Sequence, residues 1–114
     1  MKKIIWALII LTVVSCSKED KLPEGYMDHV EMVAFLIDLH TAQGIVQNLK
    51  LQPDSAAFLF NVYERQLLEE HNSEDSVFYK SYSWYLDRPD QMLDIYTAVV
   101  DTLSLRESLA RRTE

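Results

Sequence analysis

Three histidines, His29, His40 and His71, are the side chains of this chain best suited to acid–base or metal chemistry. His40 lies two residues after Asp38, and residues two apart on a helix do not face each other, so the spacing predicts no catalytic pair. None of the histidines has the His-Glu-x-x-His spacing of a metal-binding helix, so no metal site is expected. We interpret His40 as a hydrogen-bonded core residue; the alternative is a ligating or catalytic group.

Nucleophilic and phosphate chemistry lack their usual signatures. The sequence contains no Gly-x-Ser-x-Gly elbow and no glycine-rich loop, and the whole chain holds two glycines. The neighbouring carboxylates Glu69 and Glu70 are most simply part of a solvated face. We therefore expect no catalytic residues, no cofactor and no enzyme activity.

Four aromatic residues in seven form the most distinctive patch. On one helix they cannot share a face, and we expect Tyr79 and Trp84 to point to different sides from Tyr82 and Tyr85. They are either core and rim packing or an exposed surface for a protein partner or a glycan. The residues predicted for a partner-binding or structural polar site are Asp38, His40, Tyr79 and Trp84.

Cys16 is the only cysteine, and it follows a short apolar run after Met1-Lys2-Lys3. The eleven apolar-rich residues 4–14 would rise only about 16 Å as a helix, against roughly 30 Å of bilayer hydrocarbon. A basic start, a short apolar run and small residues are typical of a secretory signal peptide. Val-Ser-Cys at its end resembles a bacterial lipobox, so we predict that residues 1–15 are removed and that Cys16 is lipidated.

The residues after Cys16 predict a location in the cell envelope. Ser17, at the second mature position, is typical of sorting to the outer membrane, and residues 18–20 resemble a short charged signal for export to the cell surface. The periplasmic face and the cell surface both remain open. We expect a protein that is anchored to the outer membrane by lipid and does not span it.

The charge and the length of the chain limit its possible fold and partners. The chain has 114 residues, 11 basic against 18 acidic, and a formal net charge of −7 at pH 7. This length supports one domain with a modest core. An acidic surface argues against binding to nucleic acid.

Helical signals begin at Asp28, which forms a capping box with Glu31. Apolar side chains then recur at helical spacing to about Leu49 and widen beyond one stripe, which predicts a central helix buried on two sides. Asp54 or Ser55 is expected to cap a second helix that ends near residues 71–72, where Asn72 can adopt the left-handed conformation. Ser73 is expected to cap the third helix.

The fourth helix is expected to begin at Pro89, because proline suits the first turn. The predicted fold is all-α, a small bundle of about four antiparallel-tending helices behind a lipoprotein signal peptide and a flexible tether. The predicted parts are the signal peptide (1–15), the lipidated cysteine with its linker (16–27), the helical domain (28–105) and a polar C-terminal end (106–114).

A set of residues extends across this domain: Asp38-Leu39-His40-Thr41-Ala42, Tyr63, His71-Asn72, Phe78, Tyr82 to Tyr85, Pro89 and Ile95-Tyr96. This pattern resembles a family of small bacteroidete lipoproteins that carry the helical domain of unknown function 4296. The resemblance covers about residues 26–105 and the signal segment. It implies a helical fold and a location in the cell envelope, and it implies no activity.

Two functions remain open from the sequence. The first is a non-enzymatic accessory module, attached to the membrane through lipid on Cys16, that binds another envelope protein. The alternative is a small-ligand or glycan binder, or a weak hydrolase, that uses His40, Asp38 and the aromatic patch. The burial of His40 distinguishes these two functions, because a fully enclosed His40 with no cavity beside it would exclude the alternative.

Overall fold

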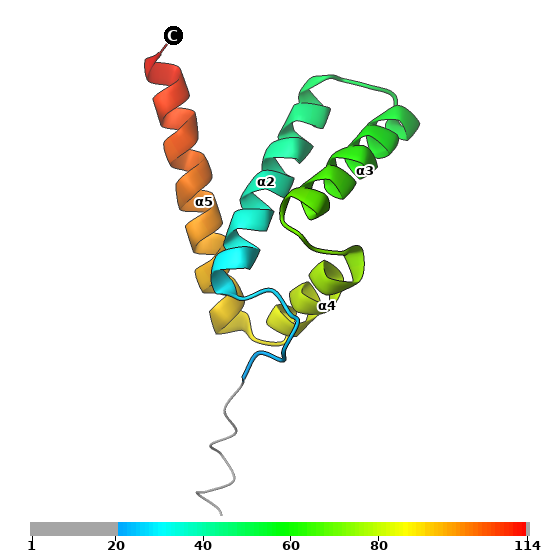
Figure 1. Ribbon diagram of the computed structural model, residues 1–114. Helices are drawn as coiled ribbons and strands as arrows, with labels where there is room; N and C mark the ends of the chain where they lie inside the picture. Colours follow the sequence, from blue (N-terminus) through cyan, green and yellow to red (C-terminus); the bar gives the residue numbers. More distant parts are fainter. Residues whose placement is uncertain (1–20, 114) are drawn as a thin grey trace, which may run out of the picture.

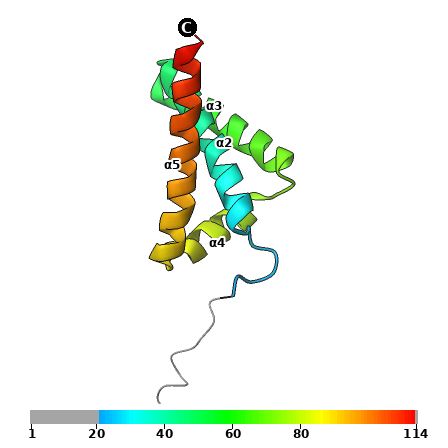
Figure 2. The ribbon, with the colours of Figure 1, turned by 90° about the vertical axis from the view of Figure 1, so that its left-hand side faces the viewer.

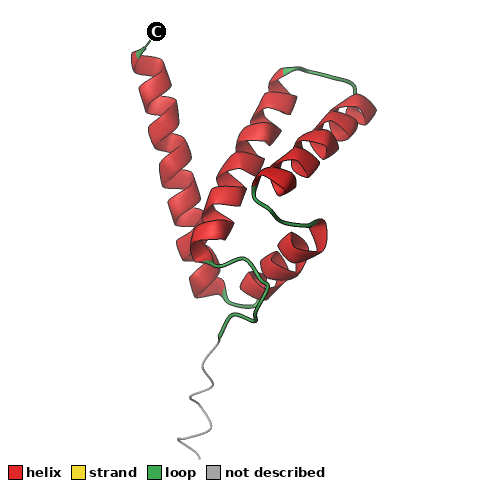
Figure 3. Ribbon diagram, viewed as in Figure 1, coloured by secondary structure: helices red, strands yellow, loops and turns green. Residues whose placement is uncertain are grey.

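The computed structural model describes residues 21–113, and this part of the chain contains helices and loops without strands (Figure 3). The helices are α2 (His29–Asn48), α3 (Pro53–Glu70), α4 (Asp75–Leu86) and α5 (Pro89–Arg112). The prediction of an all-α fold with about four helices is confirmed for residues 21–113. Cys16 and the predicted signal peptide lie outside the described residues. Within 21–113, no helix combines the length and apolar character needed to cross a bilayer.

Helix α2 occupies the centre of the arrangement, as its wide apolar surface predicts (Figure 1). It packs against α3 on one side and α5 on another, and Met32, Phe35 and Leu36 are completely buried. Ring contacts join Phe35 to Phe78 of α4, with 4.6 Å between the centroids. The core therefore lies where α2 meets the other helices.

The helices are not all antiparallel. Helices α2 and α3 form an antiparallel hairpin, and the short α4 lies across the end of the domain at which α2 begins (Figures 1 and 2). Helix α5 consequently starts at that end and runs in the same direction as α2. The expectation of antiparallel neighbours is thus correct for α2 and α3 and wrong for α2 and α5.

The capping box at the start of α2 is confirmed. The Glu31 backbone N–H donates to Asp28 Oδ1 at 2.8 Å, and the Asp28 N–H donates to Glu31 Oε2 at 3.1 Å. The expected cap of α3 is wrong, because its N-cap is Gln52 and Pro53 takes the first helical position. Asp54 lies inside the first turn of α3, where its charge complements the helix dipole.

The turn between α3 and α4 explains the second wrong cap. Asn72 adopts a positive φ of 53°, as predicted, and its N–H donates to the Glu69 carbonyl at 3.1 Å. The Ser73 N–H donates to the Leu68 carbonyl at 2.8 Å, which completes a Schellman termination of α3. Ser73 therefore belongs to the motif that terminates α3, while Glu74 is the N-cap of α4 without a side-chain bond. Helix α5 continues to Arg112, past residue 105, where we expected the domain to end.

The segment that leads into α2 is fixed to α4. Met27 is buried, its N–H donates to Ser81 Oγ at 2.8 Å, and its carbonyl accepts from the Tyr85 hydroxyl at 2.9 Å. Ser81 Oγ in turn donates to the Val77 carbonyl. These bonds satisfy both backbone groups of a residue that would otherwise be buried without partners.

Replacing Ser81 with alanine tests this attachment. Ser81→Ala leaves the buried Met27 N–H without an acceptor, so we expect the free energy of unfolding to fall by about 1–3 kcal/mol. Urea denaturation of the full chain measures it. The matched control is Ser83→Ala on the exposed side of α4, for which we expect a change within about 0.5 kcal/mol. Equal effects of the two variants would contradict the proposed role of Ser81.

Candidate functional site

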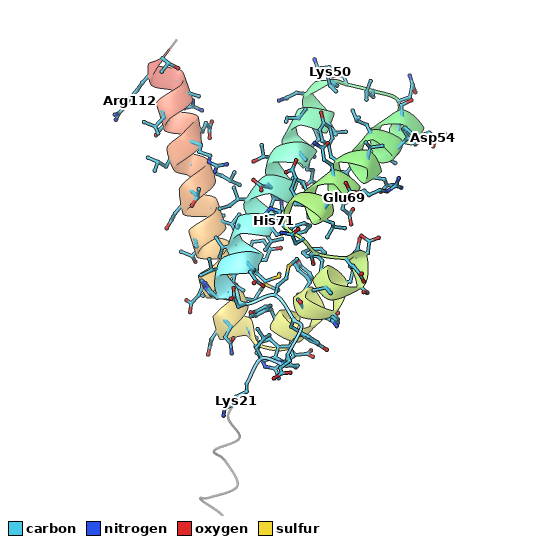
Figure 4. The ribbon with its side chains drawn as sticks, viewed as in Figure 1. Lys21, Lys50, Asp54, Glu69, His71 and Arg112 are labelled. Atoms are coloured by element: carbon cyan, nitrogen blue, oxygen red, sulfur yellow. The ribbon has the colours of Figure 1, made fainter. Side chains whose placement is uncertain are left out.

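Asp38 pairs with His71. The His71 Nε2 atom lies 2.8 Å from Asp38 Oδ2 and joins α2 to the residue that ends α3. The His71 ring also packs edge-on against Phe35, with 5.4 Å between the centroids. Figure 4 shows His71 at the end of α3, beside α2. This pair links the two hairpin helices next to the core.

His40 differs from the expected core histidine, because its side chain is only half-buried. Its Nδ1 atom lies 3.3 Å from Oε1 of Gln43, one turn along the same helix, and its ring centroid lies 6.2 Å from that of Tyr96. A cavity opens beside it. The burial criterion therefore does not exclude ligand binding at His40.

This cavity, the His40 cavity, has a volume of about 250 Å³ and receives side chains from all four described helices. Aromatic residues dominate its lining, which contains one carboxylate and no lysine or arginine. The lining residues are Leu36, Leu39 and His40 of α2, Phe60 and Glu64 of α3, Phe78, Tyr79 and Tyr82 of α4, and Tyr96 of α5.

The polar groups of the His40 cavity are largely paired with one another. The hydroxyl oxygens of Tyr82 and Tyr96 are 2.8 Å apart and share a hydrogen bond. Burial, followed by this bond, raises the pKa of Tyr96 to about 12. The Tyr79 hydroxyl donates to Glu64 Oε1 at 3.1 Å, and this bond and the negative charge of Glu64 raise the pKa of Tyr79. Each of these two hydrogen bonds therefore connects α4 to another helix.

The aromatic patch does not act as one surface. Tyr79 lines the same cavity as Tyr82, contrary to our expectation, because residues three apart are neighbours on a helix. Trp84 does not line the His40 cavity, and its ring stacks against the Arg88 guanidinium at 3.7 Å. Tyr85 is buried against Met27. The predicted site residues thus separate into different environments, with only His40 and Tyr79 in the cavity.

Two further cavities have other surroundings. One of about 660 Å³ lies where residues 25–27 meet the turn between α3 and α4, and one of about 260 Å³ lies between α2 and α3. Asp38 lines the second of these, and His71 lines the first. Across residues 21–113, no three histidine, cysteine, aspartate or glutamate side chains are grouped in a way that could hold a metal ion.

The sequence model of the family described as "Domain of unknown function (DUF4296)" matches residues 23–108. This match includes α2, α3 and α4, all of α5 except residues 109–112, and the residues that line each of the cavities described above. No curated protein and no solved structure matches the chain.

A double-mutant cycle tests the assignment of Asp38 to His71. The variants Asp38→Ala and His71→Ala should show a coupling of about 1 kcal/mol in the free energy of unfolding, because both remove one partly buried bond. A second cycle, with Asp38→Ala and His40→Ala, serves as the control and should show a coupling below about 0.5 kcal/mol. Stronger coupling to His40 would overturn the pairing.

Proposed function

Since the chain belongs to the DUF4296 family, whose description names no activity, we propose a function from the chemistry of its own surface. We infer a lipid-anchored envelope protein of bacteroidete type, held at the outer membrane through Cys16, whose helical domain binds another envelope protein without catalysing a reaction. The observation that carries this proposal is a group of exposed apolar side chains at one end of the domain.

These side chains, which we name the hairpin patch, belong to the α2–α3 hairpin, from the last turns of α2 to the middle of α3. Single exposed apolar residues are ordinary on protein surfaces, whereas a contiguous exposed apolar patch marks an interaction site. Phe58 is the most exposed of them, with 71% of its surface accessible. The hairpin patch consists of Ile45, Leu49, Leu51, Phe58 and Val62.

The position of the hairpin patch supports a protein partner rather than a lipid one. The described chain begins beside α4, and the connection between α2 and α3 lies at the opposite end of the domain (Figure 1). A lipid on Cys16 would hold the α4 end nearer the membrane, which leaves the hairpin patch facing away from it. The net charge of −7 also disfavours contact with anionic lipid.

The alternative of a weak hydrolase that uses Asp38 and His40 receives no geometric support. The Asp38 carboxylate is engaged by His71, and the two predicted residues line different cavities. A general base needs an oriented partner or a substrate within hydrogen-bonding reach. We therefore favour binding over catalysis.

Substitution within the hairpin patch tests the partner. Tagged full-length chain, recovered from detergent-solubilised envelope, should bring down a stoichiometric partner, and Phe58→Glu should reduce that recovery at least about tenfold, as loss of a central apolar contact does. Leu93→Glu is the matched control, because Leu93 is 65% exposed on α5 and lies outside the patch. Recovery of the chain alone, or equal loss in both variants, would refute the proposal.

The anchor has its own test. Mass spectrometry of the mature protein should find Cys16 at the N-terminus, carrying diacylglycerol and an additional acyl chain, since several acyl chains are needed for durable anchoring. Cys16→Ala should leave the signal segment attached and abolish the lipid modification. An unmodified Cys16 in the mature protein would exclude the lipid anchor while leaving the hairpin patch untouched.

A further inference from the structure

The His40 cavity shares no residue with the hairpin patch, and protein binding at that patch does not explain it. We propose that this cavity binds a small organic cation with a methylated ammonium group. The proposal is independent of the partner and of the anchor. It rests on three properties of the cavity: its size, its aromatic lining, and the state of its polar groups.

The cavity has the dimensions of a small-molecule site. Helix α2 contributes Leu36, Leu39 and His40, while α3, α4 and α5 supply the remaining lining residues. Its volume of about 250 Å³ corresponds to roughly eight water molecules at about 30 Å³ each. Drug-sized ligands occupy larger cavities, of roughly 300–1,000 Å³, so only a compact ligand fits here.

The lining favours positive charge. Five aromatic residues, Phe60, Phe78, Tyr79, Tyr82 and Tyr96, contribute to one cavity. The electron-rich faces of such rings attract ammonium groups within about 6 Å, and clusters of aromatic side chains are the usual site for quaternary ammonium ligands. Glu64 adds a carboxylate, and no lysine or arginine lines the cavity to neutralise it. An anionic ligand is disfavoured for the same reason.

The existing hydrogen bonds distinguish a methylated ammonium from other ligands. A glycan needs several free donors and acceptors, but Tyr82 already bonds Tyr96, and Tyr79 already bonds Glu64. A methylated ammonium without N–H groups requires no hydrogen bond, and it uses charge and ring faces instead. The raised pKa of Tyr96, caused first by burial, indicates a weakly polar environment, in which a cation–ring attraction is stronger.

A pair of probes of equal shape tests the proposal on the full chain in detergent. Choline carries the charged trimethylammonium group, and 3,3-dimethylbutan-1-ol is its neutral isostere. Calorimetry should give an affinity for choline at least about tenfold higher than for the alcohol, and NMR should show shifts of tyrosine and phenylalanine ring signals. No binding of choline at tens of millimolar, or equal affinity for both probes, would overturn the proposal.

Charge variants locate the interaction. Glu64→Gln should weaken choline binding about tenfold and leave binding of the alcohol unchanged. Glu69→Gln removes the same charge from the same helix at an exposed position outside the cavity, so it should leave choline affinity unchanged (Figure 4). An equal loss in both variants would reveal a general effect of net charge and would refute the assigned site. Tighter binding of a neutral sugar than of choline would replace the cation with a glycan.

Discussion

Burial of α2 is the constraint on which the arrangement depends. A helix with apolar residues on so much of its circumference must be covered on several sides, and α3 covers only one. The completely buried Phe35 contacts both His71, at the end of α3, and Phe78 of α4, so it marks the point where these elements meet. Helix α5 covers a further side of α2 with Ile95 and Val99, which are also completely buried.

The difference in helix length then places the His40 cavity. Helix α4 has 12 residues and α2 has 20, which correspond to about 18 Å and 30 Å. Because α4 lies across one end of the domain, it cannot cover the whole of α2. The cavity is lined by α4 residues together with Leu39 and His40 from the middle of α2, where cover by α4 gives way to α3 and α5. The difference in length between α2 and α4 therefore leaves a concave site that is lined by helix residues alone.

Local signals in the sequence were sufficient for the helices and for some of their ends. The capping box at Asp28 and the left-handed Asn72 depend on residues within one turn, so they could be predicted. Ser73 was assigned wrongly because two helices compete for it, and its N–H completes the end of α3. The direction of α5 depends on how α4 crosses the domain, which no local pattern encodes.

The candidate site was less predictable, because it depends on the rotation of each helix about its axis. His40 and Tyr79 were identified from the sequence as candidates, but Glu64 and Phe60 were not. These two lie four residues apart on α3, a spacing that indicates a shared face without indicating what that face meets. The bond from His71 to Asp38 spans 33 residues and follows only from the hairpin.

The attachment of Met27 to α4 has a mechanical consequence. A protein held by its N-terminus experiences any pulling force where its chain enters the folded part. Here both backbone groups of Met27 are bonded, to Ser81 and Tyr85 of the same short helix. Tension therefore passes first to α4, through these two bonds. The α2–α3 hairpin lies beyond this clamp, so a load on the N-terminal side of the chain reaches it only after these two bonds.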